Sequence, residues 1–161
     1  MLLHHPYVHL ISLDFSKAFD TVRHSTLISK LADFPLPNFI HNWVVAYLAD
    51  RQHCTKFDHV ISNVATINAS IVQGSGLGPI NYVINASDLH PINISNRIVK
   101  YADDTYLLVP SNNSASIPQE LTHISEWALT NNLKLNPNKS SEMMFENHVK
   151  PKILKSRCNR T

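Results

Sequence analysis

The stretch "RIVKYADDTYLLV", from Arg97 to Val109, decides the fold that we expect for this chain. Two short apolar runs rich in β-forming residues flank the polar break Ala102-Asp103-Asp104. Such runs on both sides of a short break are typical of antiparallel strands joined by a tight turn. The stretch therefore predicts a β-hairpin that carries two adjacent carboxylates at its tip.

A third carboxylate ends another predicted strand, "YVHLISLDF", residues 7–15. Because side chains alternate between the faces of a strand, Asp14 lies on the face opposite Leu13 and Phe15. If this strand neighbours the hairpin, Asp14 meets Asp103 and Asp104. Like charges at close range repel one another unless a cation lies between them. Oxygen-only ligands favour Mg²⁺ over zinc, and two such ions can serve phosphoryl transfer. The simpler interpretation of the Asp103-Asp104 pair taken alone is a plain polar turn, and the apolar flanks and Asp14 are what favour a functional site.

The remaining elements predict an α+β fold. Helical spacing favours helices over 24–34, 39–49 and 79–88 and another beginning at 117, and a last strand lies near 142–146. Residues 53–72 predict two short strands around Ser62-Asn63. We interpret the aromatic and apolar stripe of the 39–49 helix as core. This order of elements fits an antiparallel sheet with helices packed on one face, built on a split-βαβ core.

Composition narrows the class of protein. The chain has 161 residues, 43% of them hydrophobic, and a net charge of +2, which argues for one folded domain and permits nucleic-acid binding without requiring it. Cys54 and Cys158 form no metal-binding or redox pair, which fits free thiols in a reducing compartment. No apolar run approaches the ~20 residues that span a bilayer. We therefore expect an intracellular protein, in nucleus or cytoplasm, that is neither secreted nor embedded in a membrane.

All three glycines of the chain, Gly74, Gly76 and Gly78, lie in "IVQGSGLGPI", residues 71–80. Glycine is needed where the backbone adopts a positive φ or approaches another group closely. A phosphate-binding P-loop needs Lys-Ser/Thr after its last glycine, but Pro79-Ile80 follows here. The cluster therefore predicts a turn that enters a helix rather than a P-loop.

Four segments together resemble a known family. "LDFSKAFDTVRH" (13–24), "VQGSGLGP" (72–79), "YADD" (101–104) and "EWALTNNLKLNPNKSSEMMF" (126–145) follow one another like the palm motifs of reverse transcriptases. The first and last resemble the non-LTR, LINE-like (jockey/CR1-type) branch. The resemblance covers about residues 8–146. It implies a partial reverse transcriptase domain over residues 1–146 and a basic, poorly ordered tail over 147–161.

The resemblance implies an RNA-directed DNA polymerase that joins a dNTP to a DNA primer on an RNA template, with two Mg²⁺ ions or Mn²⁺ as the alternative. Asp14 and Asp103 would be the main metal ligands, assisted by the Phe15 carbonyl and by Asp104. Lys139 would donate a proton to the leaving pyrophosphate. Its simpler interpretation is a solvated surface lysine.

Three further residues are candidates for nucleotide binding by the same resemblance. The Phe19 ring would lie under the sugar and exclude a 2′-hydroxyl, Gln73 would contact the sugar and triphosphate, and Gly74 would allow close approach of the nucleotide. Without the resemblance, Phe19 is a core residue and Gln73 a turn residue. Arg23, His24 and Arg51 could touch template phosphates, but solvation at the surface is the simpler account.

The chain also departs from the family pattern. Fingers and thumb regions are missing, Val72 replaces a proline, Gly76 is an extra glycine, and Asn81 and Asn85 lie on a helix face that is apolar in the family. We therefore expect weak or no polymerase activity from the isolated chain. A non-catalytic retroelement remnant and an RNA-binding module stay as alternatives, and the oligomeric state stays open.

Overall fold

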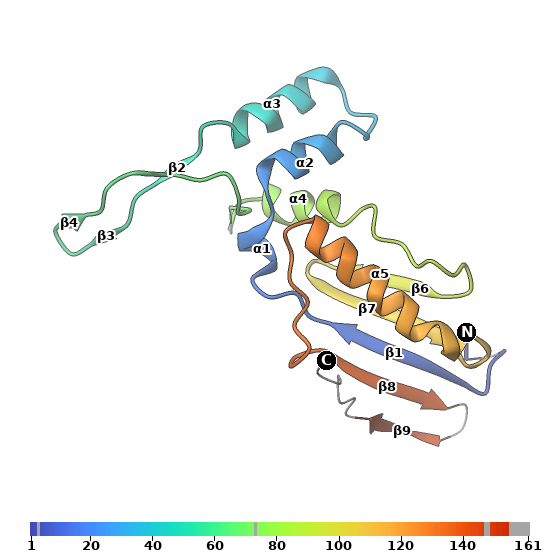
Figure 1. The fold of residues 1–161 in the computed structure, drawn as a ribbon. Coiled ribbons are helices and arrows are strands. Elements are labelled where there is room, and N and C mark those ends of the chain that lie inside the picture. Colours follow the sequence, from blue (N-terminus) through green and yellow to red (C-terminus); the bar gives the residue numbers. More distant parts are fainter. Residues whose placement is uncertain (3, 73, 147–148, 155–161) are drawn as a thin grey trace. The chain divides into compact units, whose positions relative to one another are not determined.

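The computed structural model describes every residue except 3, 73, 147–148 and 155–161 (Figure 1). The chain divides into two compact units, one made of Met1–Ala18 with Ala86–Thr161 and the other of Phe19–Asn85. The chain thus leaves the first unit after Ala18 and returns to it at Ala86. The region predicted as one partial domain, residues 1–146, covers the whole second unit and most of the first.

The first unit is built on a five-stranded antiparallel sheet with the strand order β6-β7-β1-β8-β9 (Figure 1). The strands are β1 (Tyr7–Leu13), β6 (Arg97–Tyr101), β7 (Asp104–Pro110), β8 (Ser141–Glu146) and β9 (Val149–Leu154). The predicted carboxylate-bearing hairpin is confirmed as β6–β7, and the predicted first and last strands are β1 and β8.

Strand β9 lies within residues 147–161, for which the sequence predicts a basic, poorly ordered tail. Residues Val149–Leu154 pair with β8, while 155–161 lie outside the described residues. The outer edge of β8 would otherwise present unpaired backbone N–H and C=O groups, and a following segment of almost any composition can satisfy them. Side-chain patterning therefore could not reveal this strand.

Helix α5 (Ile117–Thr130) lies over one face of the sheet, entered through the 3₁₀ segment η1 (Ser111–Ser116) (Figure 1). Ile124 and Ala128 of α5 are buried, and the Phe15 ring meets Trp127 edge to face, with 6.0 Å between ring centroids. Leu13 and Leu107 are buried as well, whereas their chain neighbours on the opposite face are partly accessible. The predicted arrangement, a sheet with helical cover on one face, is therefore confirmed.

The second unit consists of helices and a thin β-arm. Its helices are α2 (His24–Leu31), α3 (Asn38–Leu48) and α4 (Leu77–Asn85), and the one-turn helix α1 (Ala18–Thr21) spans the boundary between the units. The three predicted helices are confirmed with slightly shifted ends. Helix α2 lies between α3 and α4 and buries Leu27 and Leu31 (Figure 1).

The prediction that the apolar stripe of the 39–49 helix forms core is wrong. Trp43 is 57% exposed and Phe39 is 74% exposed, and only Val44 and Leu48 of α3 are buried. Helical spacing shows that apolar residues share a face, but it does not show what covers that face.

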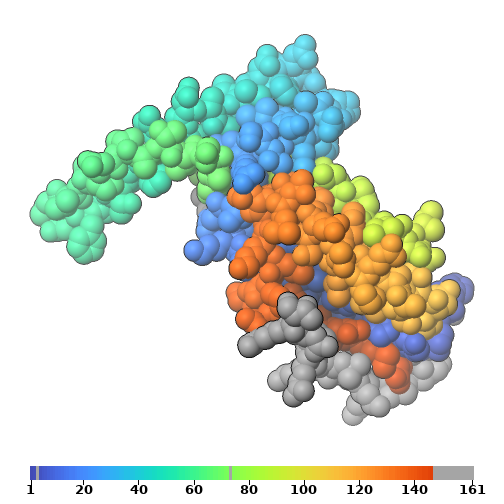
Figure 2. Space-filling view, viewed as in Figure 1, coloured from blue at the N-terminus to red at the C-terminus, as the bar shows by residue number. Residues whose placement is uncertain are grey.

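The arm consists of four two-residue strands, β2 (Gln52–His53), β3 (Lys56–Phe57), β4 (Val60–Ile61) and β5 (Ala65–Thr66), in which β2 pairs with β5 and β3 with β4. Its turn lies at Asp58-His59, not at the predicted Ser62-Asn63. Asp58 takes a left-handed conformation (φ 54°), which aspartate tolerates well. Ser62 instead bonds with Thr55 across the arm. The arm extends from the helices of its own unit (Figures 1 and 2).

Within the described residues, no helix combines the length and the hydropathy that a membrane crossing requires.

Candidate active site

The sheet of the first unit brings the predicted carboxylates to one end of two neighbouring strands. Leu13 and Thr105 form the last pair of the antiparallel β1–β7 ladder, so continuing the register by one residue brings Asp14 opposite Asp104. Opposite residues of an antiparallel pair share a face. Because Leu13 and Thr105 are buried toward the helix side, Asp14 and Asp104 lie on the opposite face.

The turn between β6 and β7 holds the third carboxylate. Tyr101 pairs with Asp104, which leaves Ala102 and Asp103 as a two-residue turn. Ala102 has φ 52°, and two-residue hairpin turns of this kind require positive φ to match the twist of the strands. Asp103 is half-buried and Asp104 exposed. The predicted hairpin tip therefore lies beside Asp14.

A loop from the other neighbour of β1 fixes the backbone at Asp14. The backbone N–H of Asn136 donates to the Asp14 carbonyl (2.8 Å), and the backbone N–H of Asp14 donates to Ser140 Oγ (3.2 Å). The Ser140 hydroxyl in turn donates to the Asn136 carbonyl (2.8 Å). Sequence reasoning missed Asn136 and Ser140. The available signal was the Asn- and Ser-rich run around Pro137, because these residue types hydrogen-bond nearby backbone groups in turns.

Lys139 lies in the same loop. Its backbone N–H donates to the Asn136 carbonyl at 3.2 Å, and its side chain is exposed. The loop that carries this lysine is therefore joined directly to the backbone of Asp14. The proton-donor role itself stays a prediction, since an exposed lysine also fits plain solvation.

The far end of the carboxylate-bearing hairpin is fixed by Glu120, a buried residue of α5. Its carboxylate accepts hydrogen bonds from the backbone N–H groups of Ile92 (3.0 Å) and Asn93 (2.8 Å) and from Asn96 Nδ2 (2.9 Å). These residues form the loop that leads into β6. Glu120 thereby joins the start of the hairpin to the helix that covers the sheet.

The chemistry of the carboxylates fits a hard divalent cation, because all three donors are carboxylate oxygens. Among the described residues, however, no three His, Cys, Asp or Glu side chains are close enough together to hold a metal ion. Mg²⁺ often binds through only one or two carboxylates and completes its coordination with water and substrate phosphates. Asp14 and Asp104 therefore fit as an open site of that kind rather than as a closed protein cage.

The predicted nucleotide-binding residues divide between the units. Phe15 belongs to the first unit, where its side chain is buried and its backbone forms a bridge with Leu135. Phe19 belongs to the second unit, and its half-buried ring contacts Tyr82 with centroids 4.9 Å apart. Gly74 is exposed in the same unit, and Gln73 lies outside the described residues. Their roles stay predictions.

The three glycines differ in backbone φ and in the space that a Cβ atom would have at each position. Gly74 has φ 80°, which only glycine adopts without strain. A Cβ on Gly78 would lie 3.1 Å from the Val72 carbonyl, so the close approach at this position is to the chain's own backbone. A Cβ on Gly76 would meet nothing within 4 Å, and its φ is ordinary. The prediction that Gly76 is the extra glycine agrees with this geometry.

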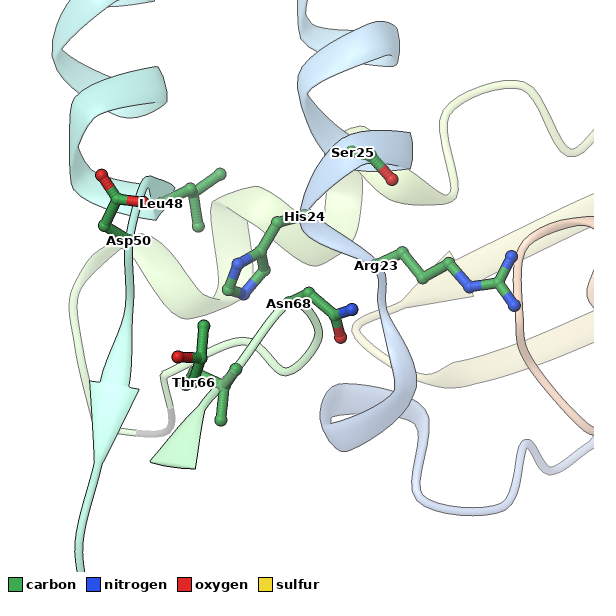
Figure 3. A pocket seen from close by; sticks show the side chains of 8 residues that line it. Arg23, His24, Ser25, Leu48, Asp50, Thr66 and Asn68 are labelled. Atoms are coloured by element: carbon green, nitrogen blue, oxygen red, sulfur yellow. The ribbon is translucent and has the colours of Figure 1, made fainter. Parts of the chain in front are cut away.

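His24 is a structural residue rather than a solvated one. It is buried, and its Nε2 forms a hydrogen bond with the Ser70 carbonyl at 2.8 Å. It lines a pocket of about 280 Å³ at the base of the arm (Figure 3). Arg23 is exposed, and its side chain points away from the His24 ring (Figure 3). The Arg51 guanidinium lies over the Tyr47 ring, 4.9 Å from its centroid.

Comparison with known proteins identifies the class to which this geometry belongs. Residues 2–157 match the family described as reverse transcriptase (RNA-dependent DNA polymerase). The chain belongs to the reverse transcriptase family.

Curated relatives place it near non-LTR mobile elements. It is 32% identical over 151 residues to the "Probable RNA-directed DNA polymerase from transposon BS" of Drosophila melanogaster, and 31% identical over 148 residues to the "RNA-directed DNA polymerase from mobile element jockey" of the same organism. These matches cover 86% and 85% of this chain, but 16% of each relative. The resemblance to a non-LTR, LINE-like reverse transcriptase region is thereby confirmed.

Solved structures support the palm-like fold. The telomerase of Candida tropicalis, in complex with a fragment of telomeric RNA, superposes with a TM-score of 0.67 at 14% identity, over 89% of this chain and 27% of the telomerase chain. The apo telomerase of the same organism gives 0.66 at 16% identity, over 90% of this chain and 32% of that chain.

Proposed function

We propose that this chain supplies the catalytic palm of an RNA-directed DNA polymerase, which transfers a nucleotidyl group from a dNTP to a primer 3′-hydroxyl on an RNA template. The observation that supports the proposal is the β1–β7 register, in which the Leu13–Thr105 pair lies next to Asp14 on one strand and to Asp104 and the Asp103 turn on the other. Family membership supports the reaction class.

Each residue of the site has a role in this proposal. Asp14, Asp103 and Asp104 would hold two Mg²⁺ or Mn²⁺ ions. When bound, the ions would neutralise charge on the triphosphate and on the attacking and leaving oxygens. The hydrogen bonds from Asn136 and to Ser140 keep the backbone of Asp14 in place, so that its carboxylate is presented at a fixed strand end.

The remaining roles concern the nucleotide. Lys139, exposed on its turn, would donate a proton to the departing pyrophosphate. The Phe19 ring would exclude a ribose 2′-hydroxyl, and the Phe15 carbonyl, Gln73 and Gly74 would contact the ions or the nucleotide. The RNA template, DNA primer and dNTP are the partners that this proposal requires.

A chimera with a full-length polymerase tests the catalytic assignment, because it supplies the regions that this chain does not contain. Residues 8–146 would replace the matched region of the jockey polymerase, and primer extension on an RNA template would be measured with Mg²⁺. We expect the Asp103→Ala/Asp104→Ala chimera to lose activity by about 10³-fold, equivalent to roughly 4 kcal/mol in the transition state. Asp58→Asn, an exposed carboxylate of the arm, is the matched control and should leave activity unchanged.

A chimera whose activity survives the double substitution would refute the assignment. An inactive parent chimera with correct folding would instead favour the non-catalytic remnant. One observation supports sequence drift of this kind: neither polar atom of the buried Asn85 side chain has a hydrogen-bond partner among the described residues.

For the isolated 161-residue chain we propose little or no activity. The same assay on the unmodified chain checks this point. Extension that the double substitution abolishes would show that the isolated chain is an active polymerase.

A further inference from the structure

An apolar groove of about 520 Å³ lies on the helical part of the second unit. Phe34, Ile40 and Trp43 line it from the side of α2 and α3, and Ile80 and Val83 line it from α4. The buried side chain of Leu31, from α2, also contributes to the lining. The groove therefore runs among three helices that belong to one compact unit.

The surface of this groove is unusual for a protein exposed to water. Trp43, Ile80 and Val83 are 57%, 54% and 61% exposed. Single exposed apolar residues are normal, but a contiguous apolar hollow marks a surface that a partner covers. Burying such side chains stabilises a contact by roughly 25 cal/mol for each Å² removed from water.

The chemistry of the lining residues indicates which class of partner fits the groove. None of the residues that line the groove is charged. A nucleic acid needs Lys or Arg side chains to neutralise its phosphates, so this surface does not suit RNA or DNA. Apart from Asn81, which is buried, the lining residues are apolar. Such a channel among helices fits the apolar face of an amphipathic helix, which presents residues at i, i+3, i+4 and i+7.

The relatives indicate where such a helix would come from. The chain spans 16% of the length of the BS and jockey polymerases, so most of a polymerase of this kind lies outside the matched region. We infer that the groove is the docking site for an amphipathic helix from another segment of the same polymerase polypeptide. The inference rests on family membership and on the surface, not on the carboxylates, so it can fail while the catalytic proposal stands.

Peptide binding tests the inference. Overlapping peptides of about 25 residues, roughly seven helical turns, would cover the BS and jockey polymerases outside their matched regions. The full chain would carry Trp127→Phe, so that Trp43 in the groove is its only tryptophan. We expect peptides from corresponding segments of both relatives to shift Trp43 emission to shorter wavelength, with Kd values of about 1–100 μM, or roughly −5 to −8 kcal/mol.

Charge placed in the groove provides the specificity control. Ile80→Glu/Val83→Glu should weaken binding at least tenfold, because two carboxylates would be buried against an apolar helix. Ile94→Glu, at a 98% exposed position of the first unit, is the matched control and should leave binding unchanged. Both substitutions lie at exposed positions, and circular dichroism would verify that each variant folds.

Three results would overturn the inference. The first is that no peptide binds the folded chain. The second is binding that the double substitution does not weaken. The third is a dimer of the unmodified chain in sedimentation equilibrium that Ile80→Glu/Val83→Glu dissociates, since the occupant would then be a second copy.

Discussion

The two units of this protein differ in the hydrogen bonding of a buried polar side chain and in the exposure of apolar side chains. In the first unit the buried carboxylate of Glu120 accepts three hydrogen bonds, and the sheet residues Leu107 and Val109 are fully covered. In the second unit the buried amide of Asn85 has no partner, and Trp43 is more than half exposed.

Among the described residues, the buried side-chain atoms without a hydrogen-bond partner belong to the second unit, and the apolar groove lies in the same unit. The first unit carries Asp14, Asp103, Asp104 and Lys139, which are the residues that we propose for catalysis and which would need fixed positions for that role. The second unit presents apolar surface that suits docking. This comparison of the two units can be tested by substitutions whose effects on the unfolding free energy differ in size and in sign.

The largest effect is expected at Glu120. Glu120→Ala removes three hydrogen bonds, including the one from the buried Asn96 amide, and leaves a cavity at a buried position, so the unfolding free energy should fall by about 3–5 kcal/mol. Urea unfolding followed by Trp127 fluorescence in a Trp43→Phe background measures this change in unfolding free energy. Glu126→Ala, exposed on the same helix, should change stability by less than about 0.5 kcal/mol. Equal losses at both positions would contradict the role of the buried carboxylate.

The second largest effect is expected at Asn85, where a substitution should increase the unfolding free energy. Asn85→Leu replaces an unsatisfied buried amide with an apolar side chain of similar size, and it should raise the unfolding free energy by about 1–3 kcal/mol. Urea unfolding followed by Trp43 fluorescence in a Trp127→Phe background measures it. A loss of stability would mean that Asn85 has a function which the unpartnered amide does not reveal.

A smaller change in stability is expected to distinguish alanine substitutions at two glycines of one turn. Gly74→Ala should destabilise the second unit by about 1–2 kcal/mol, because alanine at φ 80° is strained. Gly76→Ala should be neutral within about 0.5 kcal/mol, because its Cβ meets no atom within 4 Å. Thermal unfolding of the two variants side by side measures the difference, and similar losses would show that Gly76 is also required by the backbone.

The smallest effect is expected at the tip of the arm. Phe57 is 83% exposed, so Phe57→Ala should change stability by less than about 0.5 kcal/mol, although phenylalanine removed from a core costs about 3–5 kcal/mol. Leu107→Ala in the covered sheet is the contrasting substitution and should cost about 2–5 kcal/mol. A large loss at Phe57 would show that the arm packs against other parts of the protein in solution.

Much of the candidate site could be predicted from the sequence because its signals are local. The Ala102-Asp103-Asp104 break between apolar runs indicates a hairpin tip, and the alternation before Asp14 assigns that residue to a strand end. The supports of the site were not predictable in this way. Glu120 lies 24 or more residues from the groups that it binds, and Ser140 lies 126 residues from Asp14, so no local pattern connects them.

The sequence by itself determined helices α2 to α5, strands β1 and β8, the carboxylate-bearing β6–β7 hairpin and the resemblance to reverse transcriptases, since periodicity, turn chemistry and ordered motifs are properties of short segments. Only the tertiary structure decided that Leu13 pairs with Thr105, so that Asp14 and Asp104 end neighbouring strands at the same side of the sheet, that the chain forms two units, and that α3 lines an open groove. Strand pairing and burial depend on contacts between distant segments. Apolar spacing is the same whether the covering surface belongs to the chain's own core or to a partner.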